Sequence, residues 1–520
     1  MLLPTPLAIA LSLALAGSDS ATTTRAAEAP GPSLHYALRM SQRALRNALR
    51  LPAEGAFRSQ PHAPANTLPV TSCADDGSAG TLRSVIASAS EGDVVDLGAL
   101  DCSSITLTQG LIDLSVLGAH HINDLSIVGP GAAALTIDGN GDRVFAHGDF
   151  QVGLGTLAIS DLTIANGNYT HGLASCIDSS GNVALTRAVV TGCDASGGGP
   201  LTFGGAVSAA YLTMTDSEIG YSNSAAAGDN VAIGGGAYVS GDATLTRSAI
   251  TGNTVRAETA GDGTYYLTAG AGLYVRGALS TSVTAISHNR LYSNDIYRGP
   301  GGGAFVRANA NIVASTFSWN TAVTGGALTK AVFSHYGDPG TKLTITNSTI
   351  AVNGAMYIAG GIETFRPTTL ANSTMYSNGS FFGGALFCRG SDSTIELQST
   401  IIARNAYSDV PGYWLDILCE ELVTIQGANN LVMRTIRADL PPDTIREDPL
   451  FQFLADNGGP TETVALDPAS PAIDMGNNML RLGHDQRGEG FARTSGARTD
   501  IGAFEVQVPP TDAIFANGFD

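Results

Sequence analysis

The chain has 520 residues, of which 63 are glycine and 14% are charged, against a usual charged share of ~25%. This composition excludes a coiled coil and a disordered acidic tail, and no apolar run after the N-terminal segment approaches the ~18 residues of a membrane-spanning helix. The formal net charge of -19 repels phosphate backbones, so nucleic acid is not expected as a partner.

The first residues predict a secretory signal peptide over residues 1–20. An apolar run over residues 7–16 ends in Ala14-Leu15-Ala16, a small-x-small cleavage site. A short buried helix is the alternative, because no Lys or Arg precedes the run. Residues 21–72 follow as a basic leader with six Arg and two Glu. We expect a solvated linker there; a propeptide or contact with an anionic surface are the alternatives.

Residues 73–150 are expected to hold an N-terminal cap and the first coils of a repeat domain. Thr81 can cap a short helix over residues 81–89, whose apolar residues fall at helical spacing. Such a helix would cover the strand edges at one end of a solenoid. Further along, Asp138, Asn140 and Asp142 are spaced like the start of a calcium loop, but the later Gly and Glu of that loop are absent. A plain turn is expected, and bound Ca2+ is the alternative.

Residues 151–445 repeat a unit of about 30 residues. Each unit is marked by an apolar anchor: Ile164, Val190, Ile219, Ile250, Leu291, Phe317, Ile350, Met375 and Ile402. The position five residues before the anchor is apolar in every unit, including Ile286 before Leu291. Three residues after the anchor, six units have Asn: Asn253, Asn294, Asn320, Asn353, Asn378 and Asn405. The regularity indicates a periodic core.

The repeated unit is expected to consist of strands. Its runs are short and rich in Thr, Ile, Val and Leu, without a helical stripe. Two inward positions five residues apart need a bend between them, where small residues such as Ser217, Ser248 and Ser315 stand. Such units, stacked on one another, predict an all-β fold, the parallel β-helix, in which Asn side chains can form a ladder from coil to coil. A β-propeller is the alternative, but its repeat is longer, at ~40–45 residues.

A column of charged residues stands three positions before the anchors. It holds Asp161, Arg187, Asp216 and Arg247, followed by His288. Carboxylates and guanidinium groups would therefore alternate along an outer corner of the solenoid. We expect an ion-pair ladder that fixes the register between coils, and a charged binding ridge is the alternative.

The six cysteines fall into three pairs of sequence neighbours: Cys73 with Cys102, Cys176 with Cys193, and Cys388 with Cys419. Export would bring them into an oxidising compartment, where an even number suits disulfides. Six cysteines permit 15 connectivities, and pairing between neighbours is expected. A metal site is not expected, because no CxxC spacing occurs.

Three blocks resemble known families. Residues 71–97 resemble the N-terminal motif, named for its Cys-Ser-Leu-Arg-Glu-Ala core, of bacterial surface proteins related to polymorphic outer membrane proteins; Thr81-Leu82-Arg83-Ser84-Val85 holds the core. Residues 448–505 resemble the choice-of-anchor Q domain through Asp456-Asn457-Gly458-Gly459-Pro460, Ser470-Pro471-Ala472-Ile473-Asp474, Asp485-Gln486-Arg487-Gly488 and Asp500-Ile501-Gly502-Ala503-Phe504-Glu505. The repeats are similar to the pectin-lyase-like right-handed β-helix superfamily. The resemblance implies a secreted or surface-displayed β-helix, whose C-terminal block (residues 446–505) precedes an anchoring or sorting tail (residues 506–520).

One group of residues indicates a candidate active site. Asp416 and Glu420 share strand parity near Tyr413 and Trp414, and aromatic rings beside carboxylates can hold sugars. A capping loop with an exposed aromatic pair is the alternative. By the resemblance, lyases of this fold hold Ca2+ on a carboxylate cluster and hydrolases pair Asp residues across coils; neither pattern is legible here.

The sequence therefore predicts a monomeric extracellular or surface-displayed β-helix without a cofactor. Its expected role is to bind a polysaccharide or another cell-surface glycan, as an adhesin does, without catalysis. The alternative is a polysaccharide lyase or glycoside hydrolase that acts on uronate-containing, pectin-like polymers, which rests on the fold alone.

Overall fold

The structure is a computed structural model that describes residues 66–115, 121–148, 155–170, 174–196, 201–227, 231–258, 267–293, 299–330, 340–389, 394–407 and 414–508. The predicted signal peptide, most of the predicted leader and residues 509–520 of the tail lie outside these ranges. Residues 59–520 form one compact unit, which is described below. No helix in the described ranges is both long and apolar enough to cross a membrane.

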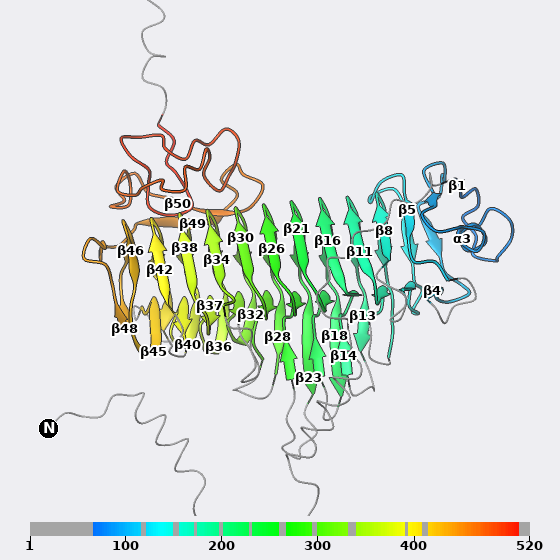
Figure 1. Ribbon diagram of the computed structural model, residues 1–520, viewed down its shortest axis with the longest axis horizontal. Coiled ribbons are helices and arrows are strands. Elements are labelled where there is room, and N and C mark those ends of the chain that lie inside the picture. Colours follow the sequence, from blue (N-terminus) through cyan, green and yellow to red (C-terminus); the bar gives the residue numbers. More distant parts are fainter. Residues whose placement is uncertain are drawn as a thin grey trace, which may run out of the picture. The chain divides into compact units, whose positions relative to one another are not determined.

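The compact unit is a right-handed parallel β-helix, as predicted (Figure 1). In the described chain, sheet 1 has 13 strands from β1 (Thr67–Pro69) to β46 (Gln426–Ala428). Sheet 2 has 12 strands from β3 (Ser104–Thr106) to β47 (Leu431–Val432), and sheet 3 has 12 from β4 (Ile112–Ser115) to β48 (Thr435–Asp439). Sheet 4 has eight strands from β13 (Asp194–Ser196) to β44 (Ala406–Tyr407). Sheet 5 consists of β14 (Leu201–Phe203), β19 (Val231–Ile233) and β24 (Leu267–Ala269).

One coil passes through the sheets in a fixed order. A typical coil runs through β16 (Tyr211–Thr215) in sheet 1, β17 (Glu218–Gly220) in sheet 2, β18 (Asn223–Ala227) in sheet 4, β19 in sheet 5 and β20 (Ala237–Val239) in sheet 3. Each coil pairs in parallel with the next, so its backbone groups are satisfied by neighbouring coils.

In coils of this kind, the backbone bends at two residues with a left-handed conformation (positive φ). The first stands between sheets 1 and 2, as at Asp216 (φ 51°), and the second between sheets 2 and 4, as at Tyr221 (φ 52°). The serine after the first bend residue ties two coils together: Ser217 N–H donates to Ser248 Oγ over 3.3 Å, and Ser315 N–H to Ser348 Oγ over 3.1 Å. The predicted bend is confirmed, with the left-handed residue one position before the serine.

The predicted register is wrong in one coil. The partner of the anchor Ile250 is Ile286, and Ile286 in turn pairs with Phe317, so Leu291 is not an anchor. The error arose because the pattern of an apolar residue followed three positions later by Asn occurs twice, at Ile286 and again at Leu291. The inward position before this anchor is consequently Thr281, which is buried and donates to Ser315 Oγ over 3.1 Å.

The register shift also moves His288. Val283 takes the first bend of that coil, and His288 takes the second bend, after sheet 2.

The other residues of the predicted charged column, from Asp161 to Arg247, pair as predicted. Arg187 binds Asp161 through two contacts of 2.6 Å, and Arg247 binds Asp216 through two of 2.7 Å. These arginine contacts lower the pKa values of both carboxyls, and the column forms ion pairs that link adjacent coils.

The predicted asparagine ladder lies in the interior. Its members are Asn253, Asn289, Asn320, Asn353, Asn378 and Asn405, all at most 2% exposed. Asn353 is typical: its Nδ2 donates to Asn378 Oδ1 over 2.9 Å and to the carbonyl of the anchor Phe317 over 2.9 Å. Asn289 occupies the rung that the sequence assigned to Asn294. The ladder gives buried polar side chains a complete set of partners beside the apolar core.

The N-terminal end is closed by helix α3 (Leu82–Ile86), with Thr81 as its N-cap, as predicted. Arg83 joins the helix to the entry loop and the first coil: its Nε donates to Asp75 Oδ1 over 2.8 Å and its Nη1 to the Leu111 carbonyl over 3.0 Å. The parallel sheet includes residues before position 73, because β1 pairs with β2 (Val94–Asp96). The short β1, which ends in proline, gives no strand signal in the sequence.

All three predicted disulfides are present: Cys73–Cys102, Cys176–Cys193 and Cys388–Cys419. The last joins paired residues of β41 (Leu386–Cys388) and β45 (Ile417–Thr424), so it links adjacent coils of sheet 3. Three disulfides are compatible with an extracellular protein.

The C-terminal block, which includes the antiparallel hairpin of β49 (Phe451–Ala455) and β50 (Thr463–Leu466), packs on the outer face of sheet 2. Gln486 is buried against two outward threonines: its Nε2 donates to Thr316 Oγ1 over 2.7 Å, and its Oε1 accepts from Thr349 Oγ1 over 2.6 Å. The next threonine in that column, Thr374, accepts the Ala503 N–H over 2.9 Å. The block therefore packs as part of the solenoid unit (Figure 1).

We predict that Asn353→Ala will lower the free energy of unfolding by about 3 kcal/mol, because it strands buried donors and acceptors in the middle of the ladder. Denaturant titration of the purified protein measures the loss. The matched control is Asn311→Ala, since Asn311 is exposed on sheet 1, and its effect should stay within about 0.5 kcal/mol. Equal losses in the two variants would contradict a stabilising ladder.

Candidate functional site

The structure places the predicted catalytic residue Asp416 at the end of the asparagine ladder. Asp416 is fully buried, and its Oδ1 accepts from Asn405 Nδ2 over 2.9 Å. Its Oδ2 accepts the Arg434 N–H over 2.9 Å. Burial raises the pKa of the Asp416 carboxyl to about 6, while these N–H donors oppose the rise. The contacts of Asp416 are those of a ladder terminus.

Glu420, the second predicted catalytic residue, has different partners. It is exposed and lies 3.5 Å from Arg389 Nε, which also contacts Glu363 Oε1 over 3.0 Å. Glu363 is almost fully buried on sheet 3, and burial raises the pKa of its carboxyl. None of the described contacts joins Glu420 to Asp416. Asp416 stands before β45, and the pairing of β45 with β48 changes register between Leu418 and Val423.

Of the two aromatic residues of the predicted site, only Trp414 lies in the described part of the chain. Trp414 is half-buried and forms an isolated antiparallel bridge with Ala406. Tyr413 lies outside the described residues. The prediction that these rings hold a sugar stays untested.

The calcium-like stretch forms a turn. Asp138 Oδ1 accepts the Asn140 N–H over 2.7 Å, and its Oδ2 accepts from Asn166 Nδ2 over 2.8 Å. Asp142 Oδ1 accepts the Arg143 N–H over 2.7 Å. The described residues hold no group of three His, Cys, Asp or Glu side chains close enough to share a metal ion.

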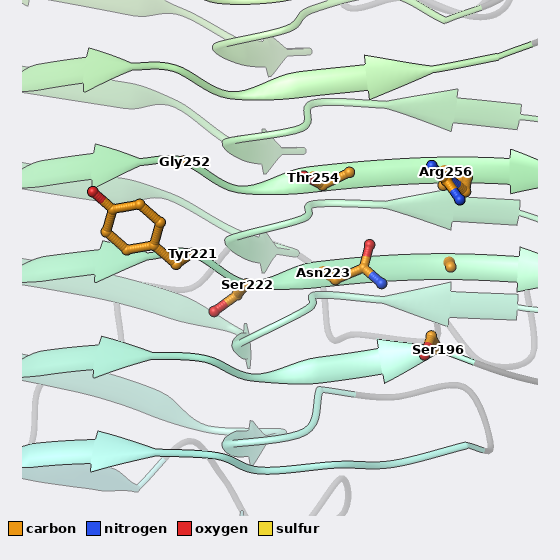
Figure 2. A pocket seen from close by; sticks show the side chains of 8 residues that line it. Ser196, Tyr221, Ser222, Asn223, Gly252, Thr254 and Arg256 are labelled. Atoms are coloured by element: carbon orange, nitrogen blue, oxygen red, sulfur yellow. The ribbon is translucent and has the colours of Figure 1, made fainter.

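A different surface combines exposed rings with polar and cationic groups. We call it the aromatic–arginine face, and it consists of the second-bend residues Tyr221, Gly252, His288 and Trp319 and the outward residues of sheet 4, Asn223, Thr254, Arg256, Arg290 and Tyr292. The sheet 4 residues belong to β18, β23 (Thr254–Glu258) and β28 (Arg290–Tyr292). Part of it is a groove of about 550 Å³ lined by Tyr221, Asn223, Thr254 and Arg256 (Figure 2).

Tyr221 is the most exposed ring of this face, with 70% of its surface accessible. Its ring lies over Gly252 of the next coil, where a Cβ atom would come within 2.8 Å of Tyr221 Cδ1. Gly252 also has a φ of +66°, which favours glycine. A side chain at position 252 would displace the ring, so glycine permits the position that Tyr221 takes beside the groove (Figure 2).

Two more rings continue the bend column. His288 and Trp319 lie in successive coils with ring planes 17° apart and centroids 6.1 Å apart. Trp319 is 47% exposed. Because the anchors Ile219, Ile250, Ile286 and Phe317 pair in succession, Tyr221 and Trp319 stand three rungs apart, or about 14 Å along the solenoid at ~4.8 Å per rung.

The arginines stand beside this column on sheet 4. Arg256 and Arg290 are both exposed, and the Arg256 guanidinium carbon lies 5.5 Å from the Tyr292 ring centroid. Pairing places Arg256 opposite Tyr292 and Thr254 opposite Arg290. Figure 2 shows Tyr221 at the bend and Arg256 farther along the neighbouring strand, with Asn223 and Thr254 between them. Rings that can stack on a sugar and groups that can bond its hydroxyls are thus interleaved.

No family model matches the chain, and comparisons with curated proteins and with solved structures find no match.

The sequence analysis missed the aromatic–arginine face. Its residues come from four coils, and the wrong register put His288 in the charged column. A usable signal does exist: two residues after the four successive anchors Ile219, Ile250, Ile286 and Phe317 stand Tyr221, Gly252, His288 and Trp319. Aromatic residues at one repeat position that is not in the core indicate an exposed ring column.

We predict that the pKa of Asp416 makes folding stability fall as the pH rises from about 4 to about 6. The carboxyl titrates near pH 6 in the folded state and near 3.8 when unfolded, so between these values the folded protein binds more protons. Asp416→Asn removes this contribution. Calorimetry should show the wild-type unfolding temperature falling relative to that of the variant across this window.

The comparison uses the difference between the two unfolding temperatures, so a constant loss of stability in Asp416→Asn does not affect it. A difference that stays constant from about pH 4 to 7 would contradict the assigned titration.

Proposed function

We propose that this protein is a secreted or surface-displayed β-helix that binds glycan on its aromatic–arginine face without catalysis. The observation that carries the proposal is the exposed ring column of Tyr221, His288 and Trp319 beside polar groups of sheet 4. Tyrosine and tryptophan present a flat apolar face with a polar edge, which suits the alternating apolar and hydroxyl surfaces of a sugar. Asn223 and Thr254 supply hydrogen-bonding groups within the groove.

Several features support an extracellular setting. The predicted signal peptide provides export, and three disulfides suit an oxidising compartment. The C-terminal block resembles the choice-of-anchor Q domain, and its motif residues pack together: Asp485 Oδ2 binds Arg487 Nη2 over 2.5 Å, and Glu505 accepts the Ser495 and Asp500 N–H groups. The proposal includes a surface role for this block, a monomeric state and no required cofactor.

Binding is preferred to lyase or hydrolase activity because of what the predicted carboxylates do. Asp416 terminates an interior ladder, and Glu420 contacts Arg389 on sheet 3. Neither is among the residues that line the groove. A glycosidase needs two carboxyl groups on opposite sides of one sugar bond.

The test measures binding of the purified mature protein to immobilised plant and bacterial polysaccharides by biolayer interferometry. We expect Tyr221→Ala and Trp319→Ala each to weaken binding at least about tenfold, since exposed rings that stack on a ligand act as hot spots. The matched control is Tyr211→Ala, because Tyr211 is 41% exposed on sheet 1, away from the face. Equal weakening by all three variants, or binding by none of the proteins, would refute the proposal.

A parallel assay separates binding from catalysis. The same polysaccharides are incubated with the protein and followed for reducing ends and for unsaturated products. The proposal predicts no turnover. Turnover lost in Asp416→Asn or Glu420→Gln would favour the enzyme alternative instead.

A further inference from the structure

A carboxylate and an amide form a pair in the outward column of sheet 4 that passes Tyr221. Strand pairing places Asp194, Asn223 and Thr254 on successive rungs of this column. Asn223 Nδ2 donates to Asp194 Oδ1 over 3.1 Å. Because a carboxylate only accepts hydrogen bonds, it fixes the amide with its nitrogen toward Asp194. The Asn223 oxygen consequently points away from Asp194, toward the strand of Thr254 (Figure 2), as an oriented acceptor.

Most other polar side chains of the groove are hydroxyls. Ser196 and Thr254 line it from the coils on either side of Asn223. Among the described lining residues, the cation is Arg256, at the end of the groove away from Tyr221 (Figure 2). Its guanidinium is occupied within the chain, with its carbon 5.5 Å from the Tyr292 ring centroid. The groove therefore offers a ligand acceptors and hydroxyls.

Tyr221 supplies an apolar wall with one open face. The bend residues one rung before and one rung after it are both glycines, Gly192 and Gly252. A Cβ atom at Gly252 would come within 2.8 Å of the ring, whereas one at Gly192 would have no atom of Tyr221 within 4 Å. The ring thus leans toward Gly252. Its other face lies on the side of the coil that carries Gly192 and Asp194, where no bend side chain covers it.

We propose, on the basis of the glycan-binding function above, that this groove selects a neutral hexose unit, which carries hydroxyls and no acidic group. The sugar stacks on the open face of Tyr221. Its hydroxyls donate to the oxygens of Asp194 and Asn223, and Thr254 can donate or accept. A carboxylate or sulfate on the sugar would face these acceptors without a donor, on a protein with a net charge of -19. Acidic sugars are therefore disfavoured.

The experiment uses isothermal titration calorimetry of the mature protein with matched pairs of tetrasaccharides. Cello-oligosaccharides are compared with their C6-oxidised glucuronate counterparts, and mannan oligomers with mannuronate oligomers of the same linkage. The members of each pair differ only in the acidic group. We expect at least one neutral sugar to bind about fivefold or more tightly than its acidic counterpart. Raising salt from about 50 to 300 mM should narrow this preference and change neutral binding less than about twofold.

Variants assign the preference to its residues. Asp194→Asn removes the charge and keeps the size of the side chain, so it should bring the neutral and acidic affinities at least about threefold closer. A loosened fold would weaken both affinities alike, so their ratio is the readout. Asn223→Ala should weaken neutral binding about fivefold or more. The matched control is Glu396→Gln, since Glu396 is an exposed carboxylate on sheet 1, and it should change neither affinity. Circular dichroism of each variant establishes that it is folded.

The outcomes separate this inference from the proposed function. Acidic oligomers that bind as tightly as their neutral counterparts, or more tightly, would overturn the inference and keep the glycan-binding function. An unchanged ratio in Asp194→Asn would do the same. Binding of no oligosaccharide would overturn both.

Discussion

Parallel pairing between successive coils is the constraint on which the rest of this structure depends. It fixes which residues share a column, and therefore which side chains meet. Inward columns bury apolar anchors. The position three residues after the anchor holds amides that bond from rung to rung, and outward columns line up rings or charges. A one-residue change of register would turn the apolar set toward solvent, so burial and hydrogen bonding select the same pairing.

The interior ladder and the exposed face are two results of the same bend. The left-handed residue of the second bend points outward, and the next residue carries a buried polar side chain, a hydroxyl at Ser222 and an amide at Asn289 and Asn320. Tyr221, His288 and Trp319 thus stand directly before Ser222, Asn289 and Asn320. The hydrogen-bonded ladder holds the backbone beneath the rings, so the rings are presented by a rigid support. Binding sites placed on such supports lose little conformational entropy when a ligand binds.

Much of the fold could be predicted from the sequence, because burial repeats at nearly constant intervals. The strands, the helical cap begun at Thr81, the neighbour disulfides and the Asp161–Arg187 pair all followed from local patterns. The register of the coil at Ile286 could not be predicted, since an apolar residue followed three positions later by Asn occurs at Ile286 and again five residues later. Asp416 and Glu420 were grouped by strand parity, but Asp416 stands before its strand, and their contacts are with different residues. The face itself depends on residues from four coils, which only the register brings together.

Hydroxyl-radical footprinting with and without bound polysaccharide tests the central claim most directly, because it reports on side chains of the unaltered protein. The account predicts that ligand protects Tyr221, His288, Tyr292 and Trp319 from oxidation, while the exposed Tyr211 and Phe453 stay as reactive as before. Protection of Tyr211 or Phe453 with Tyr221 and Trp319 unchanged would place the ligand elsewhere and contradict it.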